Sequence, residues 1–523
     1  MKKRFWSTLI GILGVSPLCA EDWPQFRGPN SRGISSESQL PMEWGPESHI
    51  SWKASVGGVA WSCPIVIGDK VVLTTAIAEG QPKPRGGFGG GGGGRQGGPG
   101  GPGGGPGAGR PPGQGGQGVP GQGGRPGQGG RGGYGAGKGP DKEYTWKVVC
   151  LERTTGKKLW DSTVSVGKPK YNTHASNTFA TETPVSDGER VFAWFGASGF
   201  AVAYDLEGTE LWKTEIGAFP NQNGWGTASS PVVHDGRLFI QSDNEEKSFM
   251  VALDAKTGKE IWKSPRLEKT DWSTPYLWKT KGRTDLVVAG SQKLRGYDPA
   301  NGKVVWELSV GGGQANASPV ADEDTLYFGT GMQGGGMGGR GGPGGPPNGG
   351  PPAGDAPGGK PPEGRPAGGR PGGFGGGGGG TLFAIKAGAI GDISLSEGKT
   401  SNEWVIWSAP KSAPAAASPL LVDGYLYLFE RQGGLVSCLN AKTGKLEYKE
   451  RIPGAKAFWA SPWSYGGKVF GIDEDGTTYV LEAGPKFKVI RKNSLSPDVY
   501  WSSPAVAGGQ LFLRGVDNLF CIK

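Results

Sequence analysis

Three histidines occur in the sequence, and one of them has neighbours that could take part in chemistry. His174 lies in segment 171–177 with Asn177, between two apolar runs. A histidine beside an amide could bind a ligand or move a proton near neutral pH, and a simple loop hydrogen bond is the alternative. No Ser, His and Asp arrangement and no His and Cys metal spacing is visible. The sequence therefore predicts no catalytic residue.

A short acidic loop is the one candidate for a metal site. Asp243, Asn244 and Glu245 follow one another directly, and carboxylate and amide oxygens are the ligands that Ca²⁺ prefers. A solvated acidic loop without metal is the alternative interpretation.

Aromatic residues recur at one position of a repeated unit. An indole combines a large apolar area with one polar N–H group, so such a set could stack on a sugar or hold a peptide. The alternative is that the rings fill a wide central bore. With His174, Asn177 and Asp243 they make up the predicted ligand site. The tryptophans are Trp61, Trp225, Trp272, Trp459 and Trp501, with Phe179 at the equivalent position of the second unit.

The repeated unit that positions these residues is clearest at 229–262. Two apolar runs flank Asp235-Gly236, a hairpin signal, and a third run reaches the turn Thr257-Gly258-Lys259 before a last strand at Trp262. Four antiparallel strands in about 40 residues describe a propeller blade. A proline at the head of the first strand, after Ser or Thr in this unit, marks the recurrence at Pro64, Pro184, Pro231, Pro275, Pro319, Pro419, Pro462 and Pro504.

Eight such positions predict an all-β fold, an eight-bladed β-propeller of four-stranded antiparallel blades in one domain, 21–523. The last unit lacks a fourth strand, whereas residues 50–53 look like a fourth strand without a blade. We expect this N-terminal strand to pair beside 519–522 and close the ring, which removes open sheet edges. We expect a monomer.

The N-terminus has the pattern of an export signal. Basic residues precede an apolar run and a small-residue exit, so residues 1–20 are predicted to be a signal peptide cleaved after Ala20. No later run is long enough for a transmembrane span. The protein is therefore expected in the periplasm or at the outer envelope. Whether Cys19 carries a lipid is left open.

Two segments, 81–140 and 331–380, consist almost entirely of Gly, Pro, Gln and Arg and are predicted to be disordered insertions in blades one and five. The formal net charge is +9. The signal holds three positive charges, the first insertion seven and the second a net two, which leaves the folded body mildly acidic. We therefore expect no nucleic-acid partner.

The unit at 252–262, of the form Ala-x-Asp-x-x-Thr-Gly-Lys-x-x-Trp, resembles the pyrroloquinoline-quinone (PQQ) repeat propellers. Segments 22–29 and 182–191 are similar to the bacterial exported group related to the assembly lipoprotein BamB. The resemblance implies the fold, and it implies either an enzyme or a scaffold. The enzymes of the family use PQQ with Ca²⁺, a catalytic Asp and often a disulfide between adjacent cysteines. This sequence has no adjacent cysteine pair.

Because the sequence shows no arrangement of catalytic residues, it favours a non-enzymatic scaffold. We expect this scaffold to bind an envelope protein partner through the face at the mouth of the central channel. One alternative is a PQQ-dependent oxidoreductase acting on an alcohol or sugar. The other is a carbohydrate-binding propeller that takes a glycan at the tryptophans.

Overall fold

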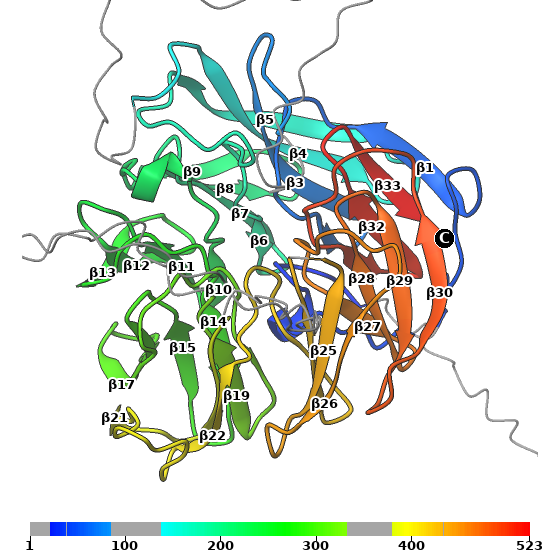
Figure 1. Cartoon of the computed structure of the whole chain (residues 1–523). Helices are drawn as coiled ribbons and strands as arrows, with labels where there is room; N and C mark the ends of the chain where they lie inside the picture. The colour runs from blue at the N-terminus through cyan, green and yellow to red at the C-terminus, as the bar shows by residue number, and fades with distance from the viewer. Residues whose placement is uncertain (1–20, 38, 85–137, 332–378, 432) are drawn as a thin grey trace, which may run out of the picture.

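A computed structural model describes residues 21–37, 39–84, 138–331, 379–431 and 433–523. Eight sheets stand around a central axis, with first strands such as β6, β10 and β14 near the centre (Figure 1). This is the predicted eight-bladed, all-β propeller. The predicted signal peptide and most of both insertions lie outside the described residues.

Blades one to four follow one another along the chain, each with its strands in sequential order. Their strands are β2 (Ile65–Ile67), β3 (Lys70–Ile77), β4 (Tyr144–Glu152) and β5 (Lys158–Gly167); β6 (Val185–Ser186), β7 (Arg190–Phe195), β8 (Phe200–Asp205) and β9 (Glu210–Glu215); β10 (Val232–His234), β11 (Arg237–Ser242), β12 (Phe249–Asp254) and β13 (Glu260–Pro265); and β14 (Tyr276–Lys279), β15 (Thr284–Val288), β16 (Lys293–Tyr297) and β17 (Val304–Ser309).

Blades five to eight complete the ring in the same way, and the last blade takes its fourth strand from the N-terminal part of the chain. Their strands are β18 (Val320–Ala321), β19 (Thr325–Gly329), β20 (Gly379–Lys386) and β22 (Val405–Lys411); β23 (Leu420–Val422), β24 (Tyr425–Phe429), β25 (Leu435–Asn440) and β26 (Leu446–Arg451); β27 (Trp463–Tyr465), β28 (Lys468–Ile472), β29 (Thr477–Glu482) and β30 (Val489–Ser494); and β31 (Ala505–Ala507), β32 (Gln510–Arg514), β33 (Asn518–Ile522) and β1 (Ile50–Ser55).

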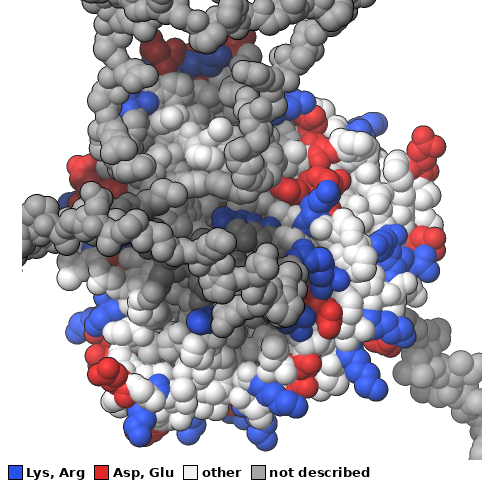
Figure 2. Space-filling view, in the orientation of Figure 1, with Lys and Arg blue, Asp and Glu red and all other residues white. Residues whose placement is uncertain are grey.

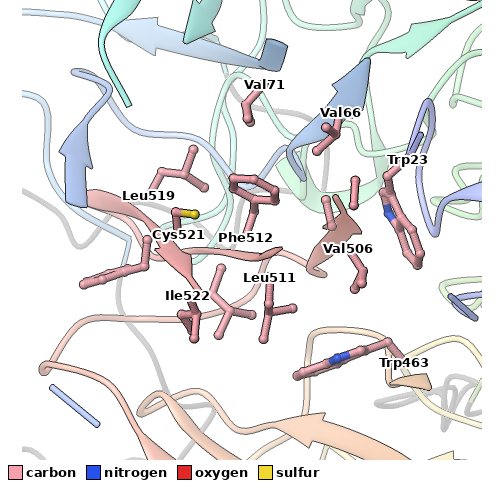
Figure 3. Packing of buried hydrophobic residues seen from close by; sticks show 14 of the residues in the cluster. Trp23, Val66, Val71, Trp463, Val506, Leu511, Phe512, Leu519, Cys521 and Ile522 are labelled. Atoms are coloured by element: carbon pink, nitrogen blue, oxygen red, sulfur yellow. The ribbon is translucent and has the colours of Figure 1, made fainter. Parts of the chain in front are cut away.

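The closure of the ring is the one predicted from the sequence. β1 pairs antiparallel with β33, with Trp52 opposite Cys521 and Ala54 opposite Leu519. A buried cluster joins this last blade to its neighbours and includes Trp23, Val66, Phe512 and Ile522 (Figure 3). The N-terminal and C-terminal parts of the chain therefore share one hydrophobic core at the seam, where β1 pairs with β33.

The tryptophan on the outer strand of one blade packs against the turn glycine of the next blade. The Nε1–H of Trp212 donates to the Ala255 carbonyl of the next blade at 3.0 Å, and its ring covers Gly258, where a Cβ would lie 2.5 Å from the indole. Gly258 also has a φ of 69°, which glycine adopts without strain. The same docking is made by Trp52 on Gly156, Trp160 on Gly208, Trp262 on Gly302 and Trp407 on Gly444.

Blade four has a fifth strand that the repeat pattern did not predict. β21 (Gly391–Asp392) pairs parallel with β17, with Gly391 opposite Trp306. The segment belongs to the long connection between β20 and β22, so a repeat count assigns it to blade five, whereas its pairing assigns it to blade four.

An N-terminal lead, residues 22–36, contains the 3₁₀ turn η1 (Pro29–Ser31) and lies near the centre of the ring (Figure 1). It bonds to several blades: Trp23 bridges to Val66, the Pro24 carbonyl accepts from Ser186, and Ser35 donates to the Ser464 carbonyl. Together these bonds fix the lead across blades one, two and seven.

Both insertions interrupt a blade between its second and third strands, as predicted, because they separate β3 from β4 and β19 from β20. The described ends of both predicted insertions contact the propeller. In the first, Lys83 forms an ion pair with Asp517 at 2.6 Å and Lys138 forms a β-bridge with Tyr171. In the second, the backbone N–H of Gly331 donates to the Gln314 carbonyl. The remaining insertion residues lie outside the described part.

Candidate functional site

A cavity of about 450 Å³ occupies the mouth of the central channel. All five predicted tryptophans line it, each from the connection before a different first strand, together with hydroxyl, amide and thiol side chains. The space-filling view shows basic side chains beside the uncovered part of the middle of the ring (Figure 2). Its lining side chains are those of Phe26, Trp61, Cys63, Ser176, Asn177, Thr181, Thr183, Trp225, Ala228, Ser230, Trp272, Thr274, Gln314, Asn316, Ser318, Ala416, Ser418, Arg431, Trp459, Ser461, Trp501 and Ser503.

Three of the indoles form a continuous stack along one side of the cavity. Trp501 lies between Trp61, at a centroid distance of 5.0 Å, and Trp459, at 4.0 Å, with interplanar angles of 21° and 20°. The guanidinium of Arg431 lies 5.2 Å over the Trp459 ring. A cation over an indole face is attracted by the ring quadrupole, so this side presents rigid aromatic area with one positive end.

His174 and Asn177 hold Trp225 in place on the other side. The His174 ring stacks on Trp225 at 4.3 Å, and its Nδ1 lies 2.7 Å from the Ser176 hydroxyl. Burial lowers the pKa of His174, which favours the neutral ring. The Asn177 amide donates to the Trp225 carbonyl at 2.7 Å while its Oδ1 accepts from Thr178 and Thr181. Asn177 lines the cavity and His174 does not, so their role toward a ligand stays a prediction.

A ring of eight hydrogen bonds surrounds the channel at the residues that precede the repeated prolines. Each backbone N–H donates to the side chain at the same position of the next blade, and seven of the eight acceptors are hydroxyls. The eighth acceptor is Cys63 Sγ, which receives Ser503 N–H at 3.2 Å. Around the ring, the donor and acceptor pairs are Cys63 to Thr183, Thr183 to Ser230, Ser230 to Thr274, Thr274 to Ser318, Ser318 to Ser418, Ser418 to Ser461, Ser461 to Ser503 and Ser503 to Cys63.

Replacing Ser461 with alanine is expected to destabilise the protein by about 1–3 kcal/mol, because the buried N–H of Ser418 loses its acceptor. Ser461→Thr is the control, since threonine already fills two ring positions, and it should stay near wild type. Urea denaturation of the three proteins measures both effects. Equal midpoints for the alanine and threonine variants would contradict a stabilising role of the ring.

The floor of the cavity comes from the N-terminal lead. Phe26 lines the cavity, and the neighbouring Arg27, 2% exposed, donates to the carbonyl of Pro419, which follows ring residue Ser418. Nε and Nη1 of Arg27 have no hydrogen-bond partner among the described residues. Burial lowers the pKa of Arg27 to about 10. A second buried arginine, Arg514, donates to the carbonyls of Ser62 and Thr74 beside the ring.

The predicted Ca²⁺ ligands use their oxygen atoms elsewhere. Both oxygens of Asp243 accept from Arg266, at 2.8 and 2.9 Å, in a pair with no exposed side-chain surface. Asn244 Oδ1 accepts two backbone N–H groups of its own loop, and Glu245 bonds Thr270. The sequence could not show this, because Arg266 lies 23 residues further along. Asp243 and Asn244 are buried, whereas Glu245 is half-buried, and the three side chains bond to different partners.

Behind Trp272 lies a second, much smaller polar cavity of about 20 Å³, roughly the space of one water molecule. Asp271 and Gln241 line it, and Oδ2 of Asp271 and Oε1 of Gln241 have no partner in the described structure. Burial raises the pKa of Asp271 well above its usual range, and the nearby Asp243 carboxylate raises it further. The protonated form of Asp271 is therefore favoured.

Asp271→Asn is expected to raise stability at neutral and alkaline pH and to change little near pH 4. A folded-state pKa above the unfolded value gives a contribution that is present at low pH and is lost as the pH rises through the folded pKa. The asparagine removes this loss, so the gap between the two urea midpoints should widen from pH 4 to pH 8. A constant gap would show that Asp271 does not titrate in this way.

The sequence reading missed Phe26, Arg27, Arg431 and the hydroxyl ring. The signal for the ring was present, because the Ser or Thr before each proline recurs with the blade. Pro64 follows Cys63 instead, and only the closed circle of bonds shows that a thiol fills the eighth position. The lead and Arg431 belong to no repeat and carried no comparable signal.

The residues present do not fit a quinone held by Ca²⁺. The side chains that line the cavity include hydroxyls, amides and Arg431, but no carboxylate among the described residues. Nor does the described part of the chain contain a group of three His, Cys, Asp or Glu side chains that could hold a metal ion. Cys63, Cys150, Cys438 and Cys521 are unbridged. In the same described residues, no helix has the length and apolar character of a membrane span.

The chain is similar to one protein family, to a curated enzyme and to several solved structures. The family model described as outer membrane protein assembly factor BamB matches residues 146–337. A polyvinylalcohol dehydrogenase from Pseudomonas sp is 27% identical over 150 residues, 20% of this chain and only 23% of that protein. BamB from Moraxella catarrhalis is 11% identical with a TM-score of 0.45, covering 72% of this chain and 90% of that one. A quinohemoprotein alcohol dehydrogenase from Comamonas testosteroni is 10% identical with a TM-score of 0.52, covering 96% and 80%, and at this identity it shares the fold. The chain is thus an eight-bladed β-propeller, and its residues 146–337 match the family model described as outer membrane protein assembly factor BamB.

Proposed function

We propose that this protein is a non-enzymatic binding propeller of the bacterial cell envelope, and that the channel mouth is its binding face. The observation that carries the proposal is the convergence of five tryptophans from five blades on one cavity. Its volume of about 450 Å³ falls in the range of about 300–1,000 Å³ that is usual for ligand sites. The match of residues 146–337 to an outer membrane assembly factor supports the envelope location.

The chemistry of the lining favours binding over catalysis. Aromatic area and hydroxyl groups provide contact and orientation, whereas a general acid and base need titratable groups within reach of the reacting atoms. Among the described lining residues, Cys63 and Arg431 are the titratable side chains. Burial raises the pKa of the Cys63 thiol, so the reactive thiolate form is disfavoured.

Capture from envelope extracts with the wild-type protein and Trp501→Ala tests the proposal. Trp501 is the middle indole of the stack, so its loss separates Trp61 from Trp459. Leu267→Ala is the matched control, because Leu267 is 88% exposed and lies outside the cavity. A partner retained by the wild type and by Leu267→Ala, and reduced at least about tenfold by Trp501→Ala, is expected. Equal capture by all three proteins would refute the proposed face.

The rival function is a quinone-dependent oxidoreductase acting on an alcohol or sugar, favoured by the similarity to the two dehydrogenases. Titration of the purified protein with PQQ and Ca²⁺, followed by quinone absorbance and dye reduction with alcohols and sugars, distinguishes the two functions. We expect no Ca²⁺-dependent binding and no dye reduction, because no carboxylate that could hold the metal ion lines the cavity among the described residues. Dye reduction at one quinone per chain would replace our proposal.

A further inference from the structure

Several hydroxyl groups of the ring act only as acceptors within the protein, so their O–H groups can donate to a ligand. A hydroxyl can accept and also donate one hydrogen bond. Each of five ring hydroxyls accepts a backbone N–H, and no described residue accepts its proton. All five line the large cavity. These residues are Ser230, Thr274, Ser318, Ser418 and Ser461. The remaining two hydroxyls, of Thr183 and Ser503, contact the Cys63 thiol.

One arginine lines the cavity, and two more are buried next to residues that line it. Arg431 lines the mouth over Trp459. Arg27 does not itself line the cavity; it follows Phe26, which does, and two of its buried nitrogen atoms have no partner in the described structure. Arg514 does not line the cavity either; it is bonded to carbonyl and hydroxyl oxygens of Ser62, next to lining residue Cys63, and it forms no ion pair with a carboxylate among the described residues. A buried arginine without a carboxylate is costly unless another anion compensates its charge.

Negative charge is scarce around the same cavity. No described carboxylate lines it. Two buried carboxyl groups that neighbour lining residues in the sequence, Glu182 beside Thr183 and Asp271 beside Trp272, have pKa values raised by burial. Both are therefore biased toward the neutral acid. Among the described residues that line the cavity, Arg431 therefore carries the one formal charge.

We propose that the cavity binds a ligand through a carboxylate, which lies on the hydroxyl ring above Arg27 while the body of the ligand packs against the tryptophans. This inference rests on the proposed function and names the chemistry of its ligand. A neutral sugar could also bond these hydroxyls, which can accept as well as donate, but it would leave the buried charge of Arg27 without an anion. A carboxylate accepts several hydrogen bonds and pairs with a guanidinium. An acidic sugar and the free C-terminus of a peptide are the two sources of this group.

Matched pairs of probes that differ only in the carboxylate test the inference in the full chain. Calorimetry compares trigalacturonate with its methyl ester, and a phenylalanine-ended tripeptide with the same tripeptide as its amide. The acid of at least one pair should bind about tenfold tighter or more than its neutral counterpart. The pair that shows the preference identifies the source of the carboxylate.

Arginine variants locate the preference. Arg27→Met should reduce the ratio of the two affinities to within about threefold. Arg32→Met is the matched control from the same lead, because Arg32 lines a different cavity, and it should keep the ratio. If Arg27→Met loses its native circular dichroism, Arg431→Met at the mouth provides the second test.

Equal binding of acid and neutral probes would overturn the carboxylate inference. So would a preference that survives both Arg27→Met and Arg431→Met, or the absence of binding by every probe. The proposed function would survive each of these results if capture from extracts still depends on Trp501. A loss of that dependence would refute the binding face itself.

Discussion

Replacing Arg266 with methionine is expected to lower the free energy of unfolding by about 3–5 kcal/mol, because it leaves the Asp243 carboxylate buried without its cation. The pair has no exposed side-chain surface and is bidentate, and Arg266 also donates to the Tyr297 hydroxyl and the Ala289 carbonyl of blade four. Burial alone would lower the pKa of Arg266, but Asp243 raises it, so the guanidinium stays charged. In the wild type, the hydrogen bonds of Arg266 therefore connect blade three to blade four, and the methionine variant loses this connection.

Urea denaturation measures this loss, and two further variants define its origin. Lys168→Met breaks an ion pair whose side chains are 61% and 81% exposed, so its urea midpoint should stay close to that of the wild type. A double variant, Asp243→Leu with Arg266→Met, removes both charges and should be more stable than Arg266→Met alone. A double variant less stable than the single one would show that packing of the arginine, and not the orphaned charge, dominates.

Replacing Trp52 with alanine is expected to cost about 3–5 kcal/mol, since it removes a large buried side chain at the closure of the ring. Trp52 is 8% exposed, donates from Nε1 to the Arg153 carbonyl at 2.9 Å and covers Gly156 of blade one. It also repeats, between blade eight and blade one, the docking of a tryptophan on a turn glycine, since β1 is the fourth strand of blade eight.

Trp52→Phe separates the contributions, because it keeps most of the apolar contact and loses the hydrogen bond. We expect its urea midpoint between those of the wild type and Trp52→Ala. Limited proteolysis should cut the alanine variant first near β1, because the strand that loses its anchor opens locally at low free energy. Proteolysis at unchanged sites and rates would contradict a closure role for Trp52.

The sequence by itself determined the architecture. Turn chemistry is local: both Asp235 and Gly236 have positive φ, 47° and 67°, as the tight hairpin between two strands requires. The proline spacing counted eight blades, and the orphan strand at 50–53 predicted the seam, because a four-strand unit that ends one strand short needs a partner. The placement of the insertions followed from the same count.

Only the tertiary structure decided the chemistry of the channel. The ring bond from Ser503 to Cys63 joins residues 440 positions apart, and Arg27 reaches Pro419 across 392. Asp243 is a buried ion-pair partner because the fold brings Arg266 to it. Periodicity and turn residues report on neighbours within one blade. Contacts between blades and with the N-terminal lead depend on how the sheets pack, and those contacts decide which side chains face the cavity.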